Sequence, residues 1–264
     1  MRRIAGIHNI SYQALHHTWT EAIDRVALER ALADDISHVA VVQHETTTGR
    51  LNDIGAVAEV CRNRGVPLLL DGVSSFGAEQ IRFEDWNIAA CAATANKCLH
   101  GVPGVSFVIL KRELLPRDHS QRSLYLDLSA YLELQDGGGT PFTQAVQGFY
   151  ALAEALSEHR DAGGWQARRA AYRERMARVA TGLRQLDLSP LLPDGSSSCV
   201  LNAFNVPEGL DYQTLHDRLK ERGFIIYAGQ GDFARRIFRI SLMGAITHKD
   251  IERLLDAFAA ILSE

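Results

Sequence analysis

Lys97 and Asp71 are the two residues of this sequence whose types and positions best suit chemistry. Asp71 ends the apolar run 66–70, and Lys97 follows the apolar run 88–93 just before a turn rich in glycine and proline. A lysine amine forms a Schiff base with a carbonyl group, and a carboxylate at the end of a buried strand can pair with a protonated pyridine nitrogen. Lys97 is the only lysine in the first 110 residues. The pair therefore suggests amine chemistry with pyridoxal 5'-phosphate (PLP).

Each of the two residues also has a simpler interpretation. A lysine after an apolar strand is commonly a solvated loop residue, and an aspartate at a strand end commonly caps a turn or helix. Here the small residues that follow Asp71 in the segment 71–77 (DGVSSFG) would let a ligand approach the backbone. Lys97 enters a constrained turn that ends at Pro103 and Gly104. From the residues alone, both interpretations stay open.

The elements that must position these residues alternate between strand and helix. Residues 37–42 form a β-branched run, residues 52–64 have apolar positions at helical spacing with Gly65 as a stop, and residues 66–70 are continuously apolar. This alternation predicts a parallel sheet covered on both faces, with ligands bound at the carboxyl ends of its strands, where Thr48, Asp71 and Lys97 fall. Residues 105–110 follow too soon for a crossover, which predicts an antiparallel strand.

The second half of the chain has a different pattern. It predicts long helices at 143–158 and 165–186, strands at 196–205, 224–227 and 237–242, and helices at 212–222 and 249–263. We therefore expect an α/β fold with a large domain (residues 1–160) that has a mostly parallel sheet, and a small C-terminal α+β domain (residues 161–264).

Composition favours small-molecule chemistry in a soluble protein. The 264 residues are 46% hydrophobic and 23% charged, and the net charge of −4 gives no electrostatic footprint for nucleic acid or an anionic membrane. The four cysteines lack CxxC spacing, so we expect buried free thiols in a reducing compartment and no metal site. Neither a membrane span nor a signal peptide is evident, which predicts a cytoplasmic location.

Three segments resemble a known family: HETTTG (44–49), DGVSSFG (71–77) and ANKCLHGVPG (95–104). They are similar to the corresponding segments of the 2-aminoethylphosphonate–pyruvate transaminases, which are class V aminotransferases of PLP fold type I. The similarity runs from about residue 1 to the C-terminus, and the string around Lys97 separates this family from its relatives. The resemblance implies a homodimer that transfers the amino group of 2-aminoethylphosphonate to pyruvate in phosphonate catabolism, giving phosphonoacetaldehyde and L-alanine.

The resemblance also implies a role for each matching residue. Lys97 would be the catalytic Schiff-base lysine, Asp71 the partner of the pyridine nitrogen, and Thr48 a contact of the cofactor ring. Thr143 would reach the cofactor phosphate of the neighbouring subunit, with a simple helix N-cap as the alternative. Arg239 would bind the acidic group of both substrates, because a planar fork of donors suits a carboxylate or phosphonate.

This chain differs from the family pattern at several places. Gln43 and His44 stand where the family has His-Cys, and His100 stands where it has glutamine. The resemblance also implies roughly a hundred further residues before Met1, a typical domain's worth, including the loop that holds the cofactor phosphate. Two alternatives to this function therefore stay open: another class V transaminase of the alanine–glyoxylate or serine–glyoxylate type, or an inactive truncated paralogue. A misassigned start codon would also explain why the N-terminal segment of the family is missing from this sequence.

Overall fold

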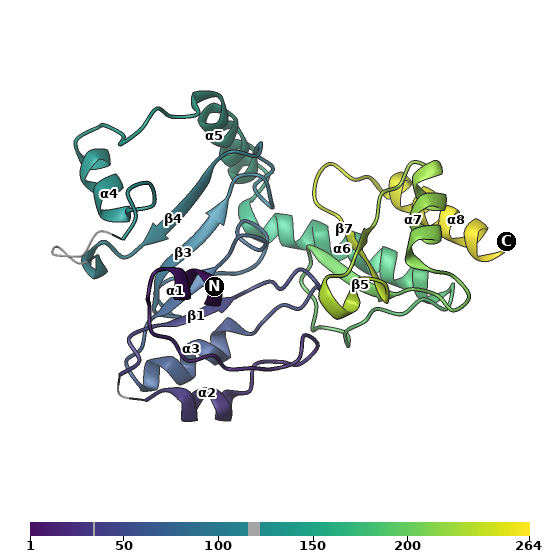
Figure 1. Ribbon diagram of the computed structural model, residues 1–264. Coiled ribbons are helices and arrows are strands. Elements are labelled where there is room, and N and C mark those ends of the chain that lie inside the picture. Colours follow the sequence, from purple (N-terminus) through teal and green to yellow (C-terminus); the bar gives the residue numbers. More distant parts are fainter. Residues whose placement is uncertain (34, 116–121) are drawn as a thin grey trace.

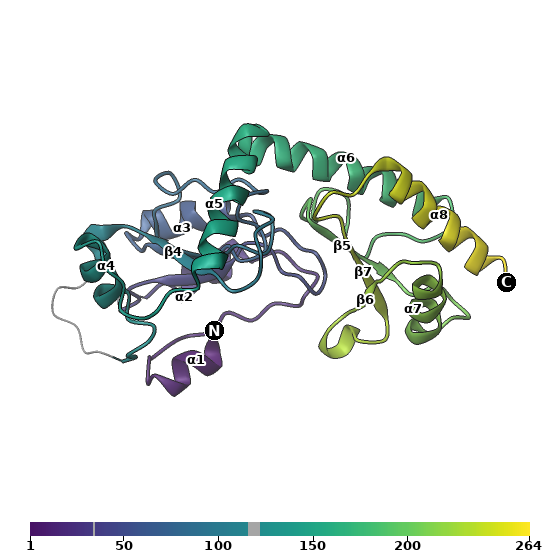
Figure 2. The same cartoon turned by 90° about the horizontal axis from the view of Figure 1, so that it is seen from above.

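Two β-sheets, one in each half of the chain, lie on either side of a long helix that joins them. The computed structural model describes residues 1–33, 35–115 and 122–264. In Figures 1 and 2 the connecting helix α6 (Gly164–Arg184) runs from the first sheet to the second. This arrangement matches the α/β organisation expected from the sequence.

The first sheet has four strands in the order β1-β2-β3-β4. Its strands are β1 (Val39–Val42), β2 (Leu68–Asp71), β3 (Ile88–Thr94) and β4 (Ser106–Leu110). The pairs β1–β2 and β2–β3 are parallel, and β3–β4 is antiparallel. Both the parallel sheet and the antiparallel return of β4 are thus confirmed.

Helix α3 (Ile54–Asn63) covers this sheet with its apolar side. Ile54, Val57 and Cys61 are buried and share one core cluster with strand residues such as Leu68 and Ile88. The side chain of Asp53 caps the start of α3, and its end is followed by Gly65 at φ 67°, a left-handed conformation that favours glycine. Helices α1 (Arg2–Ile7) and α2 (Arg25–Ala31) precede β1, and α2 packs on α3.

The segment between β4 and α6 is helical. A 3₁₀ turn, η1 (Arg112–Leu114), follows β4, and the helices α4 (Leu128–Asp136) and α5 (Val146–Asp161) come after it. Helix α5 starts at residue 146 rather than at the expected 143, because Ala145 is the N-cap residue and no side chain caps the helix. The predicted division into residues 1–160 and 161–264 falls at the junction of α5 and α6 and stays a prediction.

The second sheet is antiparallel, with strand order β5-β7-β6. It is formed by β5 (Leu201–Asn205), β6 (Tyr227–Ala228) and β7 (Ile237–Ser241), with the 3₁₀ turn η2 (Gly231–Phe233) between β6 and β7. Its core centres on Phe238, whose ring lies 5.5 Å from those of Phe204 and Phe258. Helices α6, α7 (Tyr212–Glu221) and α8 (His248–Leu262) contribute to the same core.

Two strands of this sheet are shorter than the sequence predicts. Strand β5 begins at 201 instead of 196, because Ser198 Oγ and the backbone N–H of Cys199 donate to the carboxylate of Glu79. Strand β6 covers 227–228 instead of 224–227, because the N–H of Phe224 turns back to the carbonyl of Leu219 at the end of α7. Polar contacts from distant parts of the chain thus decide these boundaries.

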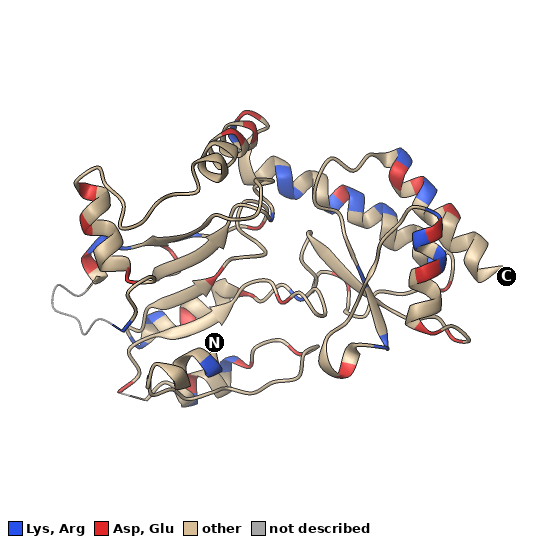
Figure 3. Cartoon of the chain, turned by 45° about the horizontal axis from the view of Figure 1, so that its top comes forward, with Lys and Arg blue, Asp and Glu red and all other residues tan. Residues whose placement is uncertain are grey.

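The surface carries charges of both signs, and Figure 3 shows them side by side along α6, α7 and α8. Within the described ranges, no helix is both long and apolar enough to cross a membrane. The four cysteines are free and buried, as expected. Burial raises the pKa of Cys61 to about 11 and that of Cys98 to about 12.

Candidate active site

Asp71 and Lys97 lie at the same edge of the first sheet. Asp71 is the last residue of β2 and is paired in register with Ala92 of β3, and Lys97 sits in the turn that follows β3. The N–H of His100 donates to the carbonyl of Lys97 at 3.0 Å and closes this turn. The ammonium group of Lys97 forms no hydrogen bond or ion pair with any residue that the structure describes. The structure therefore places both predicted residues at one edge of the sheet, Asp71 on β2 and Lys97 after the neighbouring β3.

The carboxylate of Asp71 is held by its own loop. Its Oδ1 atom accepts a hydrogen bond from the N–H of Val73 at 3.1 Å. Among the described residues, the Oδ2 atom has no hydrogen-bond partner. One oxygen thus orients the side chain while the other can pair with a ligand.

His44 is a buried residue beside this pair that sequence reasoning did not select. Its Nδ1 atom lies 3.0 Å from the carbonyl of Ser74, and its Nε2 atom has no partner in the described part of the chain. Burial lowers the pKa of His44, and nearby Lys97 lowers it further, whereas Glu79 and Glu45 act in the opposite direction. The signals in the sequence were its place shortly after the strand at 39–42 and its difference from the family pattern.

Thr48 is completely buried in the turn that follows β1. Its Oγ1 atom donates to Glu45 Oε2 at 2.6 Å and also lies 3.2 Å from the carbonyl of Trp19, while its N–H donates to the same Glu45 oxygen at 2.9 Å. The hydroxyl also accepts a hydrogen bond from the N–H of Arg50 at 3.4 Å, so its bonds are used within its surroundings. Gly49 has φ 84°, and a Cβ atom there would lie 2.5 Å from the carbonyl oxygen of Leu201, so this turn needs glycine.

Arg239 reaches this same turn from the second sheet. From β7 its Nε atom donates to the carbonyl of Ala228 and its Nη1 atom to the carbonyl of Thr46, both at 2.7 Å. Burial lowers the pKa of Arg239, and the negative charge of Glu45 opposes that shift. The structure therefore places Arg239 beside the segment that carries Thr48, although the two residues are far apart in the sequence.

Thr143 is the one predicted site residue that the structure does not bring to this cluster. It is exposed and lies before α5, whose N-cap is Ala145, so the N-cap alternative is wrong. No hydrogen bond within the described ranges joins its side chain to Lys97 or Asp71. A role in the site of a neighbouring subunit would be compatible with this exposure.

A buried carboxylate joins the two sheets near the site. Glu79, only 3% exposed, accepts hydrogen bonds from Ser198 Oγ and the N–H of Cys199, both at 2.8 Å. Its other oxygen lies 3.0 Å from Nε of Arg169 on α6. Sequence reasoning missed this contact because its members are about ninety residues or more apart.

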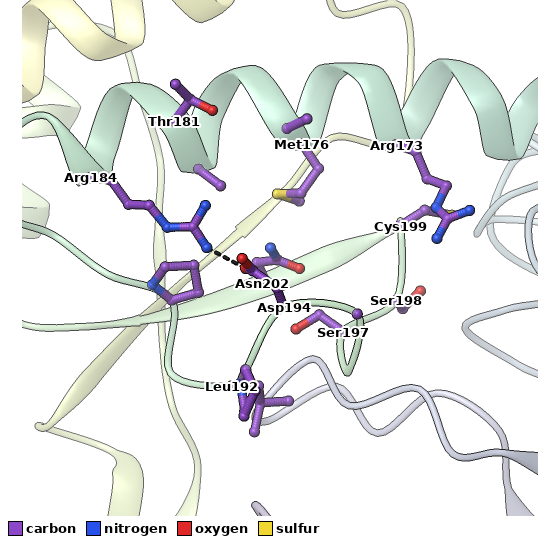
Figure 4. A pocket seen from close by; sticks show the side chains of 15 residues that line it. Arg173, Met176, Thr181, Arg184, Leu192, Asp194, Ser197, Ser198, Cys199 and Asn202 are labelled. Carbon is purple, nitrogen blue, oxygen red and sulfur yellow. Dashed lines mark hydrogen bonds and ion pairs between the residues drawn. The ribbon is translucent and has the colours of Figure 1, made fainter.

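Two cavities lie away from Lys97 and Asp71. The larger, about 310 Å³, lies between α6 and residues 190–202, and none of the predicted site residues lines it. Figure 4 shows Arg184 paired with Asp194, with Asn202 close to this pair. The smaller, about 200 Å³, adjoins the turn of Thr48 and is lined by His17, Trp19, Glu45, Arg50 and Asn52.

Residues 5–254, nearly the whole chain, match the sequence profile of the family described as aminotransferase class-V. The chain belongs to the class V aminotransferase family. Among curated relatives, it is 39% identical over 227 residues to a 2-aminoethylphosphonate–pyruvate transaminase of Vibrio cholerae, covering 84% of this chain and 62% of that protein. It is 41% identical over 237 residues to the transaminase of the same name from Vibrio vulnificus, covering 87% and 64%. The chain thus spans somewhat less than two thirds of the length of these relatives.

Solved aminotransferase structures share the fold. Aspartate aminotransferase of subgroup IV from Thermus thermophilus superposes with a TM-score of 0.87 at 25% identity and covers 99% of this chain and 73% of its own. Alanine–glyoxylate aminotransferase from Nostoc superposes with a TM-score of 0.90 at 24% identity, covering 98% and 71%. The fold of this class V aminotransferase is therefore PLP fold type I, as expected.

The donors around Lys97 fit a pyridine cofactor. The amine of Lys97 is unpaired within the described residues, and Asp71 keeps one carboxylate oxygen free at the same edge of the sheet. A primary amine forms the Schiff base with PLP, and a carboxylate pairs with its pyridine nitrogen. The site residues of the chain are thus compatible with PLP.

Proposed function

We propose that this protein is a PLP-dependent aminotransferase that transfers the amino group of 2-aminoethylphosphonate to pyruvate, giving phosphonoacetaldehyde and L-alanine. The observation that carries the proposal is the placement of Lys97 and Asp71 at the ends of the adjacent strands β3 and β2. The names of the curated relatives support the choice of substrates.

PLP, when bound, supplies an electron sink for the carbon that carries the amino group. In this proposal Lys97 anchors the cofactor covalently and, once released, its amine takes a proton from that carbon and returns it during the transfer. Asp71 pairs with the pyridine nitrogen and keeps it protonated. Thr48 borders the ring, and Thr143 contributes to the phosphate site of the neighbouring subunit.

Arg239 binds the acidic group of each substrate in turn. Its Nε and Nη1 atoms are fixed by the carbonyls of Ala228 and Thr46, whereas Nη2 has no hydrogen-bond partner in the part of the chain that the structure describes. The fixed guanidinium is oriented before the substrate arrives, which lowers the entropy lost on binding. A phosphonate and a carboxylate both accept hydrogen bonds from such a group.

The family implies a homodimer, and the described surface supports one. Val108 and Ile109 of β4 and Phe149 and Tyr150 of α5 are exposed apolar residues. Such residues mark interaction surfaces when they gather on one part of a protein. We propose that this part forms the subunit interface in a cytoplasmic dimer, and light scattering after size-exclusion chromatography would test it.

The test of the function has two stages. Protein mixed with PLP is reduced with borohydride, and mass spectrometry locates the pyridoxyl group, which we expect on Lys97 and not in Lys97→Ala. Alanine formation from pyruvate is then measured with 2-aminoethylphosphonate or serine as amine donor, and glycine formation from glyoxylate is measured with alanine or serine as amine donor. Labelling of Lys97 together with turnover of serine alone would favour a serine–glyoxylate type of enzyme, and no labelling at all would contradict the proposal and favour an inactive paralogue.

A further inference from the structure

We propose that His100 is a positioning residue that, together with Tyr172, fixes the turn of Lys97 to helix α6 and to the loop that follows β7. This inference rests on the proposed role of Lys97. It concerns a residue that the established family membership leaves without a role.

The turn of Lys97 is short and its conformation is demanding. The N–H of His100 bonds to the carbonyl of Lys97, and the N–H of Gly101 bonds to the carbonyl of Ala95 at 2.8 Å. His100 itself has φ 67°, a left-handed conformation that a residue with a side chain adopts only at a cost of about 1 kcal/mol or more. Contacts of its side chain must offset this cost.

The imidazole of His100 makes those contacts. Its Nε2 atom forms a hydrogen bond with the hydroxyl group of Tyr172, and the two rings stack with their centroids 6.1 Å apart. The N–H of Gly244, which lies beyond β7, points to the same Nε2 atom at 3.2 Å. Tyr172 is only 1% exposed, so its hydroxyl group needs this partner.

Two arginines of α6 extend this contact on either side of Tyr172. Arg168 donates from Nη1 at 2.6 Å to the carbonyl of Cys98, the residue that follows Lys97 in the sequence. Arg175 donates to the carbonyl of Gly244 at 3.0 Å. The turn of Lys97 and the loop after β7, the strand that carries Arg239, are thus held to one helix by His100 and by these two arginines.

The contact requires a neutral imidazole, because Nε2 receives the N–H of Gly244. Burial is the main cause that lowers the pKa of His100 to about 4, and the charges of Arg168, Arg175 and His159 act in the same direction. The hydroxyl group of Tyr172 also stays neutral, because burial raises its pKa to about 12. His100 therefore stays neutral at physiological pH, and acidification should release the turn.

Three variants separate this role from a general structural one. His100→Gln keeps an acceptor that can reach Tyr172, whereas His100→Asn tolerates the left-handed backbone but is one methylene shorter. Tyr172→Phe removes the hydroxyl group from the other side. His38→Asn, at an exposed position, is the matched control.

The experiment measures PLP affinity and the visible absorbance of lysine-bound PLP between pH 4 and 9. We expect His100→Asn and Tyr172→Phe to weaken PLP binding roughly tenfold, as the loss of one hydrogen bond of about 1.4 kcal/mol implies, and to shift the pH midpoint of the band. The PLP affinities of His100→Gln and His38→Asn should stay within about threefold of the wild-type value, because at most one weak contact is lost. Equal affinity and an unchanged pH profile in all four variants would overturn the proposal.

A second readout does not need the cofactor. In histidine-labelled protein without PLP, the ring of His100 is identified by its loss from the spectrum of His100→Gln and titrated by NMR. We expect no titration of His100 above about pH 5 in the wild type, because burial and the charges of Arg168 and Arg175 lower its pKa. Ordinary titration of His100 in the wild type contradicts the inference, whereas absence of a lysine-bound band with a silent His100 contradicts only the proposed function.

Discussion

The guanidinium of Arg239 donates from Nη1 to the backbone carbonyl of Thr46 at 2.7 Å, so the second sheet touches the turn that follows β1 of the first. This bond, with the one to Ala228, fixes the planar group and leaves Nη2 for a ligand. The arrangement explains how one residue from the C-terminal half can serve a site built on strands of the N-terminal half.

Replacing Arg239 tests whether its guanidinium binds the acidic group of the substrates. Arg239→Lys keeps the charge but loses the fork, and we expect KM for both 2-aminoethylphosphonate and pyruvate to rise by roughly 30- to 150-fold, as the loss of a charge-assisted bond of about 2–3 kcal/mol implies. Steady-state kinetics measures the change. The control is Arg236→Lys, whose guanidinium lies over the ring of Phe233 instead; equal KM values in both variants would contradict the assignment.

Replacing Asp71 tests the electron sink. Asp71→Asn keeps the bond to the N–H of Val73 but loses the negative charge, so the pyridine nitrogen should no longer stay protonated. We expect kcat to fall by about 100-fold or more, equivalent to about 2.7 kcal/mol of barrier, while PLP still labels Lys97. Rapid-scan absorbance and mass spectrometry would separate the two effects. An Asp71→Asn enzyme with a normal kcat would exclude this role.

Replacing Glu79 tests the contact that joins the two sheets. Glu79→Gln removes a buried charge that faces Arg169 and receives two hydrogen bonds, so we expect the free energy of unfolding to fall by about 2–4 kcal/mol. Urea denaturation gives the value. The matched control is Glu174→Gln, which is half exposed and pairs with Arg178, and there the loss should stay under about 1 kcal/mol. Similar losses in the two variants would argue against a special role for Glu79.

The buried His44 makes stability depend on pH. Its folded pKa lies below the ordinary histidine value, so below about pH 6.5 the unfolded chain takes up a proton that the folded chain does not. The free energy of unfolding should therefore fall as the pH drops through this range. Urea denaturation from pH 8 to 5 should show a smaller fall in His44→Gln than in the wild type. The exposed His38→Gln should keep the wild-type slope, and a wild-type slope in His44→Gln would refute the explanation.

Local patterns predicted much of the fold. The end of α3 before Gly65 and the antiparallel β4 both follow from short-range sequence signals and are confirmed. The start of β5 could not be predicted, because it depends on Glu79, which lies far away in the sequence. In the site, the apolar runs predicted that Asp71 and Lys97 lie at the ends of strands. The surroundings of His44 and the hydrogen-bond partners of His100 could not be predicted, because they arise only from tertiary packing.

Helix α6 has a consequence for how the protein unfolds. Its N-terminal part holds Cys98 and Glu79 through Arg168 and Arg169, and further along Gly182 lies so close to α8 that an added Cβ would be 2.4 Å from Leu255. At 1.5 Å per residue these contacts are spread over about 20 Å of one continuous rod. A rod fixed at both ends cannot release one sheet while it stays attached to the other. The two sheets should therefore melt in a single cooperative transition, and calorimetry should record one peak rather than two.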